Sequence, residues 1–346
     1  MKKILILYRE LAGYFVECVN RLCEQYDVQV DVIAYPVNSD APFKLDFAPG
    51  IAVYERKAMD HEKISLLIAQ NNYSLIFCGG WSDPDYLRAI KHKQDISLLA
   101  FDTQWQGSLK HWLYAVYGKI MIRPKFRFAF VPGEKQFQLA RHLGFPASSI
   151  IRGVYSCDVE KFAPLHTLRK FRPAGKNRKL VFTGRYATEK FIQPLCSAML
   201  ELRMEGFSDW ELHCIGTGPL WDSRISGEGI IHHGFMQPAE LFEFMKGGDA
   251  FILPSTFEPW GVVVHEFAAA GYPLILSDNI GASEVFLENE KNGFAFRSGD
   301  ISDLKSKMQQ LFSLDDAALR SMGEKSSVLS NQITQSIWAQ RLYDII

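Results

Sequence analysis

The feature that most constrains this chain is a regular alternation of short apolar runs with longer amphipathic stretches. The apolar runs predict buried strands, and the amphipathic stretches between them predict helices. Strands that alternate with helices in this way form a parallel sheet with helices on both faces. The alternation stops once and then restarts, so the sequence predicts two Rossmann-like α/β domains.

The predicted elements fall into two series with one break between them. The first series has strands at residues 2–8, 28–35, 74–79, 96–101, 128–131 and 150–154, and helices at 11–26, 61–70, 83–91, 108–120 and 134–143. The second series has strands at 180–183, 210–215, 230–232, 250–253 and 274–276, helices at 190–205, 238–245 and 262–270, and a mainly helical end after residue 301. Residues 164–178 are polar, basic and interrupted by Pro164, Pro173 and Gly175, so they are predicted to be a linker.

Charge is divided unevenly along a chain of 346 residues whose formal net charge is −1. Residues 1–173 hold 23 Lys and Arg against 17 Asp and Glu, and the rest holds 15 against 22. The excess of cations in residues 101–173 suits an anionic acceptor, a membrane surface or the acidic second half. The six cysteines lack metal-ligand spacing and are expected to be reduced. The apolar run at 4–7 is too short for a signal peptide, and no stretch is long enough to span a bilayer, so a cytoplasmic protein is expected, with a peripheral position at the inner membrane face left open.

Two glutamates and a glycine mark the strongest candidate site, in residues 250–284. A predicted strand at 250–253 leads into a loop with Glu258, and a predicted helix follows Gly261 and places Glu266 about one turn in. The N–H groups at the start of a helix suit a phosphate, and carboxylates accept hydrogen bonds from sugar hydroxyls. This order suits a nucleotide sugar, whose diphosphate lies between a ribose and a hexose.

A basic cluster follows another predicted strand end. Gly184 and Arg185 come directly after the strand at 180–183, and Lys190 follows. Arginine offers a planar fork to a phosphate, and lysine offers a point charge. A solvated loop is the alternative interpretation of this cluster taken alone.

Residues 180–296 resemble the donor domain of retaining GT-B glycosyltransferases of glycosyltransferase family four. The resemblance is carried, in the family's order, by Gly184-Arg185 with Lys190, Gly216-Thr217-Gly218-Pro219, His233-Gly234-Phe235, Asp249 to Ser255, the pair Glu258 and Glu266, Gly271-Tyr272-Pro273 and Gly281-Ala282-Ser283-Glu284. A weaker similarity covers Val131 to Glu134, Val154 to Asp158 and Phe162. The resemblance implies a GT-B fold, in which two Rossmann-like domains have parallel sheets facing across a cleft.

The resemblance also implies domain roles and residue roles. Residues 1–163 would form the acceptor-binding domain, joined by a crossover helix at about 331–346, and residues 179–330 would form the donor-binding domain. Arg185 and Lys190 would bind the donor diphosphate, Glu266 the ribose and Glu258 the transferred sugar. Further donor contacts would come from Gly184, Gly216, Phe235, Met236, Gly261 and Val262.

The first series departs from the family at two places. Gly13 is the one glycine where many members have a Gly-Gly turn that approaches the donor. Asp102 stands where many members carry a histidine near the acceptor, so it is a candidate for orienting an acceptor hydroxyl, with a cap or loop carboxylate as the alternative.

Three other patterns have ordinary structural interpretations. Asp83-Pro84-Asp85 has the spacing of a metal motif but also that of a helix start. Gly216-Thr217-Gly218 lacks the third glycine of a dinucleotide fingerprint. The predicted helix at 108–120 mixes aromatic and basic residues. As a functional element it would rest on anionic lipid or line an acceptor groove. As an ordinary helix of the domain it would pack its aromatic rings inward.

Together these patterns predict a retaining hexosyltransferase that needs no metal and no cofactor beyond its nucleotide-diphosphate sugar. Its acceptor would be a carbohydrate or glycolipid hydroxyl, and nucleic acid is not an expected partner. The alternatives are a nucleotide-sugar binding protein with a silent acceptor site and a GT-B epimerase or phosphorylase. Base, sugar and acceptor are left open.

Overall fold

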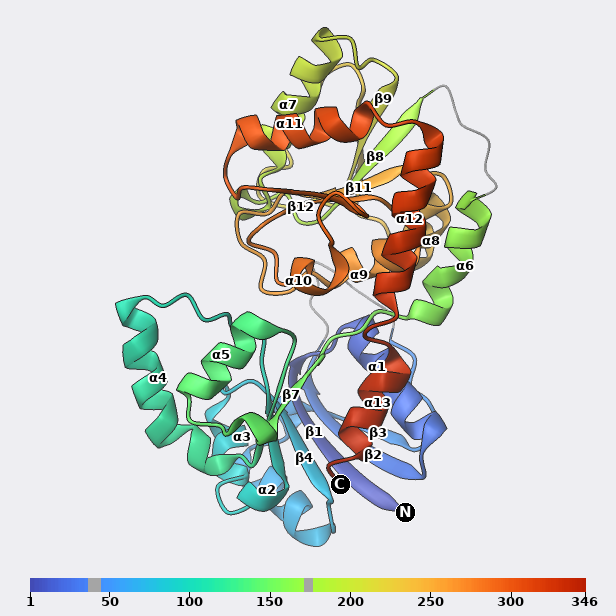
Figure 1. Cartoon of the computed structure of the whole chain (residues 1–346). Coiled ribbons are helices and arrows are strands. Elements are labelled where there is room, and N and C mark those ends of the chain that lie inside the picture. The colour runs from blue at the N-terminus through green and yellow to red at the C-terminus, as the bar shows by residue number, and fades with distance from the viewer. Residues whose placement is uncertain (37–44, 171–176) are drawn as a thin grey trace. The chain divides into compact units, whose positions relative to one another are not determined.

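The computed structural model describes residues 1–36, 45–170 and 177–346. These residues form two compact units, Met1–Asp158 with Ile333–Ile346 (unit 1) and Val159–Gln332 (unit 2). Each unit has its own parallel sheet with helices packed around it (Figure 1). The expected fold class, two Rossmann-like α/β domains, is therefore confirmed.

Unit 1 has a sheet with the strand order β3-β2-β1-β4-β5-β6-β7 among the described residues, and every pair is parallel. Its strands are β1 (Lys2–Glu10), β2 (Val28–Tyr35), β3 (Ile51–Glu55), β4 (Leu75–Gly79), β5 (Ser97–Ala100), β6 (Phe128–Val131) and β7 (Ile150–Arg152). Its helices are α1 (Gly13–Gln25), α2 (His61–Gln70), α3 (Pro84–Ala89), α4 (Leu109–Met121), α5 (Glu134–His142) and α13 (Gln335–Tyr343).

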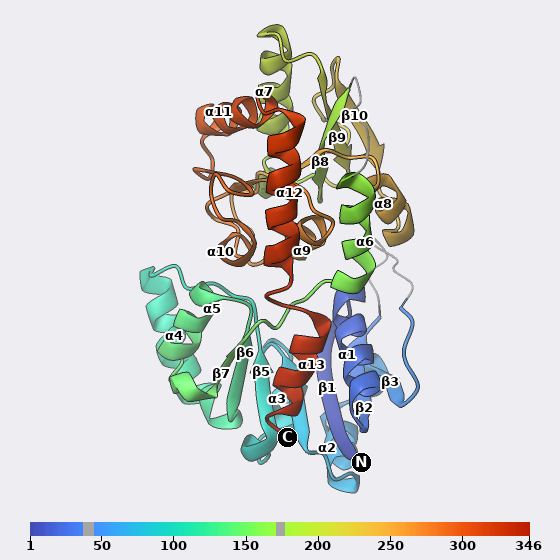
Figure 2. The same cartoon turned by 45° about the vertical axis from the view of Figure 1, so that its right-hand side comes forward.

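Two hydrophobic cores lie on the two faces of this sheet, because successive side chains of a strand point to opposite faces. Ile4 and Ile6 of β1 belong to one core, and Leu5 and Leu7 belong to the other. Helices α1 and α13 cover the first face and lie side by side (Figures 1 and 2). Trp338 of α13 is fully buried there, and its indole N–H donates to the Val154 carbonyl at 2.9 Å. The last helix of the chain is thus part of the first core.

Unit 2 has a sheet with the order β10-β9-β8-β11-β12-β13 in the described part of the chain. Its strands are β8 (Arg178–Thr183), β9 (Trp210–Ile215), β10 (Ile230–Gly234), β11 (Ala250–Leu253), β12 (Leu274–Ser277) and β13 (Gly293–Phe296). Its helices are α6 (Val159–Lys170), α7 (Ile192–Met204), α8 (Pro238–Met245), α9 (Val262–Ala269), α10 (Ser283–Phe286), α11 (Ile301–Phe312) and α12 (Asp316–Ser330). All of its strand pairs are parallel.

The predicted linker at 164–178 is wrong in its first part, because helix α6 runs through it despite Pro164. This helix packs against α9 and α12. The Arg169 guanidinium donates to four backbone carbonyls of unit 2 and lies 3.4 Å from the centre of the Tyr272 ring. Residues 171–176 of the predicted linker lie outside the described residues. The first unit therefore ends at Asp158, before the predicted boundary at 163.

Candidate functional site in unit 2

The predicted donor residues gather at the carboxyl edge of the second sheet. Strands β8 and β9 pair in register up to Thr183 opposite Ile215, so Gly184 and Gly216 leave the sheet side by side. Phe235 and Met236 follow β10, and the loop with Glu258 follows β11. Ligands of open α/β sheets bind at this edge.

Glycine allows the first two loops to pack backbone on backbone. The Gly184 N–H donates to the Ile215 carbonyl at 3.0 Å, and the Gly216 N–H donates to the Gly234 carbonyl at 2.7 Å. Gly216 has a φ of +128°, and a side chain there would overlap the Gly184 carbonyl oxygen. Only glycine fits both conditions. The close packing leaves the Arg185 side chain exposed at the edge of the sheet.

Lys190 and Glu258, which were predicted separately, form an ion pair. Lys190 ends a short 3₁₀ turn (Thr188–Lys190) rather than lying in the predicted helix at 190–205, because Phe191 adopts a left-handed φ of 57° before α7 begins. The Thr256 N–H donates to the Glu189 carbonyl at 2.7 Å, which ties this turn to the loop after β11. The two charged side chains are 19% and 16% exposed, so solvent screens the pair only in part.

Gly261 sets the start of helix α9. It has a φ of +93°, and a Cβ there would lie 3.1 Å from Glu258 Cγ. Val262 is the first residue of the helix. The N–H groups of a first helical turn have no acceptor within their own helix and carry the positive end of its dipole. The helix start therefore presents hydrogen-bond donors beside Glu258.

Glu266 lies one turn further along α9, where burial raises the pKa of its carboxyl to about 7. The positive charge of Lys161 on α6 acts in the opposite direction. Its neighbour His265 is fully buried, donates from Nε2 to the Ser330 carbonyl at 2.8 Å, and has a pKa lowered to about 4 by burial. Glu266 consequently exchanges its proton close to neutral pH, while His265 stays neutral.

The loop after β10 adds an aromatic and an apolar side chain to the same edge. Phe235 is 39% exposed and Met236 is partly buried. Below them, His232 Nδ1 is 2.7 Å from the Tyr186 hydroxyl, and its Nε2 is 3.0 Å from the Ile225 carbonyl. His232 therefore supports the loop from inside the unit.

The unit 1 cavity and the Asp-Pro-Asp motif

Unit 1 has a cavity of about 420 Å³ at the carboxyl ends of β1, β4 and β5. Asp102 lines it, so the structure gives this carboxylate a ligand-accessible position. Burial raises the pKa of Asp102, and a hydrogen bond with Tyr155 lowers it by a smaller amount. Gly13 is the first residue of α1, and the next residue, Tyr14, lines the cavity.

Sequence reasoning missed the aromatic wall of this cavity. The wall consists of Tyr8, Tyr14, Trp81, Phe101, Tyr114 and Tyr155. The Trp81 indole N–H donates to the Tyr114 hydroxyl, which links the loop after β4 to helix α4. Tyr8, at the end of the strand predicted at 2–8, was an available signal, because polar aromatic residues at a strand's carboxyl end suit a ligand site. The cavity combines flat aromatic faces with the partly buried Asp102 carboxylate.

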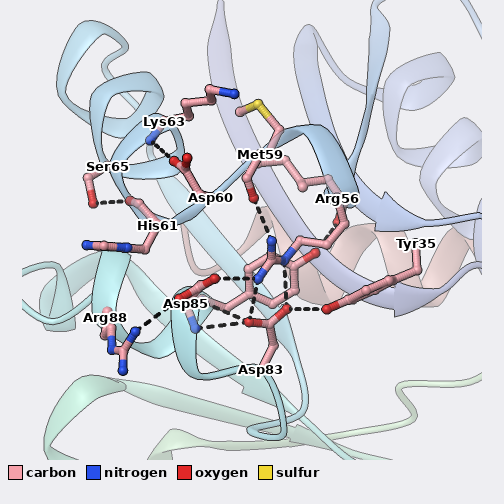
Figure 3. Close-up of polar contacts among 12 residues, drawn as sticks. Tyr35, Arg56, Met59, Asp60, His61, Lys63, Ser65, Asp83, Asp85 and Arg88 are labelled. Carbon is pink, nitrogen blue, oxygen red and sulfur yellow. Dashed lines mark hydrogen bonds and ion pairs between the residues drawn. The ribbon is translucent and has the colours of Figure 1, made fainter.

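Asp83 and Asp85 are engaged by an arginine, as Figure 3 shows. Asp83 caps α3 by accepting from the Asp85 N–H at 3.0 Å and the Tyr86 N–H at 3.4 Å. The Arg56 guanidinium donates to Asp83 at 2.7 and 3.0 Å and to Asp85 at 2.8 Å. The interpretation of this motif as a helix start is confirmed.

The geometry of the two units and the known relatives

The carboxyl edge of the second sheet brings together backbone N–H groups at a helix start, two cations and two carboxylates, at the place where open α/β sheets bind their ligands. Residues 177–313 match the family model described as Glycosyl transferases group 1. The match lies within unit 2, and it confirms the resemblance stated from the motifs of this domain.

Curated relatives match part of the chain. The sulfoquinovosyl transferase SQD2 of Arabidopsis thaliana is 28% identical over 164 residues, which cover 44% of this chain and 31% of that protein. The chain thus spans about a third of the length of the first curated relatives that it matches.

Solved structures match over both units and show the fold. Sucrose-phosphate synthase from Thermosynechococcus elongatus has a TM-score of 0.78 at 16% identity, covering 99% of this chain and 98% of that one. Anabaena HepE, solved in complex with UDP-glucose, has a TM-score of 0.71 at 15% identity, covering 99% of each chain. The fold is that of GT-B glycosyltransferases.

Proposed function

We propose that the protein is a retaining glycosyltransferase that moves a hexose from a nucleotide-diphosphate sugar to a hydroxyl acceptor. Unit 2 holds the donor, and unit 1 holds the acceptor. The observation that carries this proposal is the cluster at the start of α9, where the Lys190–Glu258 pair adjoins the Gly261 turn and Glu266 follows one turn later.

Each donor group has a matching partner in this cluster. Arg185, Lys190 and the N–H groups at Gly261 and Val262 bind the diphosphate, because cations and a helix start both favour an anion. Glu266 accepts hydrogen bonds from the ribose hydroxyls, and Glu258 accepts them from the transferred hexose. Phe235 and Met236, with the loops at Gly184 and Gly216, border the base.

The difficult step is the departure of the diphosphate. The bond between the anomeric carbon and the phosphate oxygen breaks as the acceptor oxygen bonds to that carbon from the same face. The acceptor proton passes to the departing phosphate, so the configuration is retained. Arg185 and Lys190 stabilise the negative charge that grows on the leaving group, so we propose that the reaction needs no metal. Preorganised groups of this kind contribute about 3–4 kcal/mol each.

The acceptor is a carbohydrate or glycolipid hydroxyl, oriented by Asp102 in the aromatic cavity of unit 1. Aromatic faces stack on the apolar faces of sugar rings, and a buried carboxylate accepts from a hydroxyl. The structure of HepE in complex with UDP-glucose supports a nucleotide-sugar donor. We place the protein in the cytoplasm, with a peripheral contact to the membrane.

The test is turnover with a panel of nucleotide-diphosphate sugars and mixed glycan and glycolipid acceptors. We expect a new glycoside and one free nucleoside diphosphate per transfer. Lys190→Met and Glu258→Gln each lower kcat by about 10²–10³. Lys246→Met is the matched control, because it also removes one lysine from an ion pair, with the exposed Glu243, and leaves activity unchanged.

Three outcomes would contradict the proposal. Donor binding without any release of nucleoside diphosphate would favour the silent binding protein. Release without a new glycoside, or a glycosyl phosphate product, would favour an epimerase or a phosphorylase. Full activity of both Lys190→Met and Glu258→Gln would show that the donor binds elsewhere.

A further inference from the structure

Helix α4 exposes its large apolar side chains instead of burying them. Leu109, Leu113 and Ile120 are 77%, 67% and 66% exposed, and four more large side chains of this helix are about half exposed: Trp112, Val116, Tyr117 and Met121. A surface helix of a water-soluble domain normally turns such residues toward the core. The alternative interpretation of this helix, with its aromatic rings packed inward, is therefore wrong for Tyr117, whereas the half-exposed Trp112 ring also packs against Trp105 and His142.

The inward face of α4 explains this orientation. It is formed by Ala115 and Gly118, which are buried, together with the partly buried Tyr114. A side chain at Gly118 would overlap Leu143, which follows α5, so the two helices pack closely because residue 118 is glycine. The small residues fix which side faces the core, and the large apolar residues remain outside. Figures 1 and 2 show α4 beside α5 at the β5–β7 end of unit 1.

The segment that carries this apolar face has charges of one sign. Residues 103–133 contain five cations, Lys110, Lys119, Arg123, Lys125 and Arg127, and no Asp or Glu. Lys110, Lys119 and Arg127 have exposed side chains. A helix with an apolar face and cations beside it is the type that lies in the interface of an anionic bilayer.

We propose that α4 docks unit 1 on an anionic bilayer, with Leu109, Leu113, Val116 and Ile120 entering the lipid boundary. Trp112 and Tyr117 belong at the level of the headgroups, where amphipathic rings are enriched. Lys110 and Lys119 contact the anionic headgroups. A second copy of the chain fits this face less well, because a symmetric contact would bring the same cations together without a carboxylate to pair with them.

Docking through α4 also specifies the acceptor, and this step alone rests on the proposed function. Tyr114 lines the unit 1 cavity together with Asp102, while its helix neighbours Leu113 and Val116 face outward. A helix that touches both the bilayer and the cavity brings the cavity next to the lipid headgroups. The acceptor hydroxyl therefore belongs to a lipid-anchored sugar or headgroup.

Vesicle flotation tests the docking without any activity assay. We expect the full chain to float with vesicles of phosphatidylcholine and phosphatidylglycerol, and only weakly with phosphatidylcholine alone. Lys110→Glu with Lys119→Glu lowers the partition coefficient by about thirtyfold or more, because each lost cation contributes roughly fivefold and each new carboxylate adds repulsion from the anionic surface. Leu113→Asp with Ile120→Asp lowers it by at least about tenfold.

The matched controls are Leu66→Asp on α2 and Met204→Asp on α7, which change residues that are 56% and 82% exposed on other helices. Both controls float like the wild type. Equal melting temperatures show that all variants are folded. The α4 variants should keep the wild-type turnover with a water-soluble donor and acceptor, and this result separates a loss of docking from a failure of the proposed function. Wild-type protein that stays unbound with anionic vesicles would overturn the proposal, as would a solution dimer that the α4 variants dissociate.

Discussion

The protonation of Glu266 gives a prediction whose size follows from the structure. Burial on α9 raises its pKa from an ordinary value of 4.5 to about 7 in the folded protein. Between pH 4.5 and pH 7 the folded protein therefore binds this proton more tightly than the unfolded chain does. Its contribution to stability is greatest below pH 4.5, falls as the pH rises, and is constant above pH 7.

The full shift corresponds to about 3 kcal/mol at 1.36 kcal/mol per pH unit, and partial exposure of the side chain lowers this to about 1–3 kcal/mol. Glu266→Gln removes the titration and keeps the shape. At pH 8 the variant should be more stable than the wild type by about 1–3 kcal/mol, a rise in melting temperature of about 2–10 °C. At pH 4.5 the two proteins should melt together. His265 titrates in both proteins, so its effect cancels in the difference.

Scanning calorimetry from pH 4.5 to pH 8 measures this difference directly. The same carboxyl should couple donor binding to pH, because hydroxyl donors favour its ionised form. Titration calorimetry should then show donor binding about tenfold weaker at pH 6 than at pH 8 in the wild type, and no such dependence in Glu266→Gln. A variant that is less stable than the wild type at pH 8, or a difference that does not vary with pH, would refute the reasoning.

Three further predictions concern residues that stabilise the two units. Gly261→Ala should lower stability by about 1–3 kcal/mol, since a side chain at φ +93° is strained and meets Glu258 Cγ at 3.1 Å, whereas Gly13→Ala, with open space around residue 13, should be nearly neutral in the same thermal melts. Trp338→Phe should lose the hydrogen bond to Val154 and Trp338→Ala should cost about 3–5 kcal/mol in urea unfolding; equal stability of the alanine variant would show that α13 is dispensable to the first core. Asp83→Ala should destabilise unit 1 by about 1–3 kcal/mol, because it removes the α3 cap and leaves Arg56 with fewer partners. The loss should be the same with and without added divalent cation. A variant that melts at the same temperature as the wild type would contradict this role.

The alternation of strands and helices was predictable because the central strands are buried on both faces. Runs such as 4–7 and 250–253 are apolar throughout, and the structure buries every one of these side chains. Strands β3 and β13 were not predicted. β3 is largely exposed, and β13 begins at a glycine that usually ends an element, so neither has the continuous apolar run of a central strand.

The course of the chain between the units was not predictable from local signals. Pro164 is a helix breaker in most contexts, but α6 continues through it because Arg169 is held by four carbonyls that are about 80 to 100 residues away in sequence. A contact of that kind leaves no mark in a local pattern. For the same reason, the outward orientation of α4 depended on Gly118 meeting Leu143.

The candidate site was predictable as a set of residues, but not as a set of contacts. Gly216 and Gly261 stand where the backbone requires glycine, so their positions follow from strand ends in the sequence. The Lys190–Glu258 ion pair joins residues 68 positions apart, and the raised pKa of Glu266 arises from the burial of α9. Both depend on tertiary packing.

The most direct test of the donor site measures the binding of nucleoside diphosphates and nucleotide-diphosphate sugars by thermal shift and titration calorimetry. A ligand at 100 times its Kd adds about 2.7 kcal/mol of stability, which is a readily measured rise in melting temperature. We predict saturable binding of one nucleotide-diphosphate sugar that weakens strongly in Lys190→Met and is unchanged in Lys246→Met. The account would be contradicted if no member of the panel stabilised the protein, or if Lys190→Met bound the same ligand as tightly as the wild type.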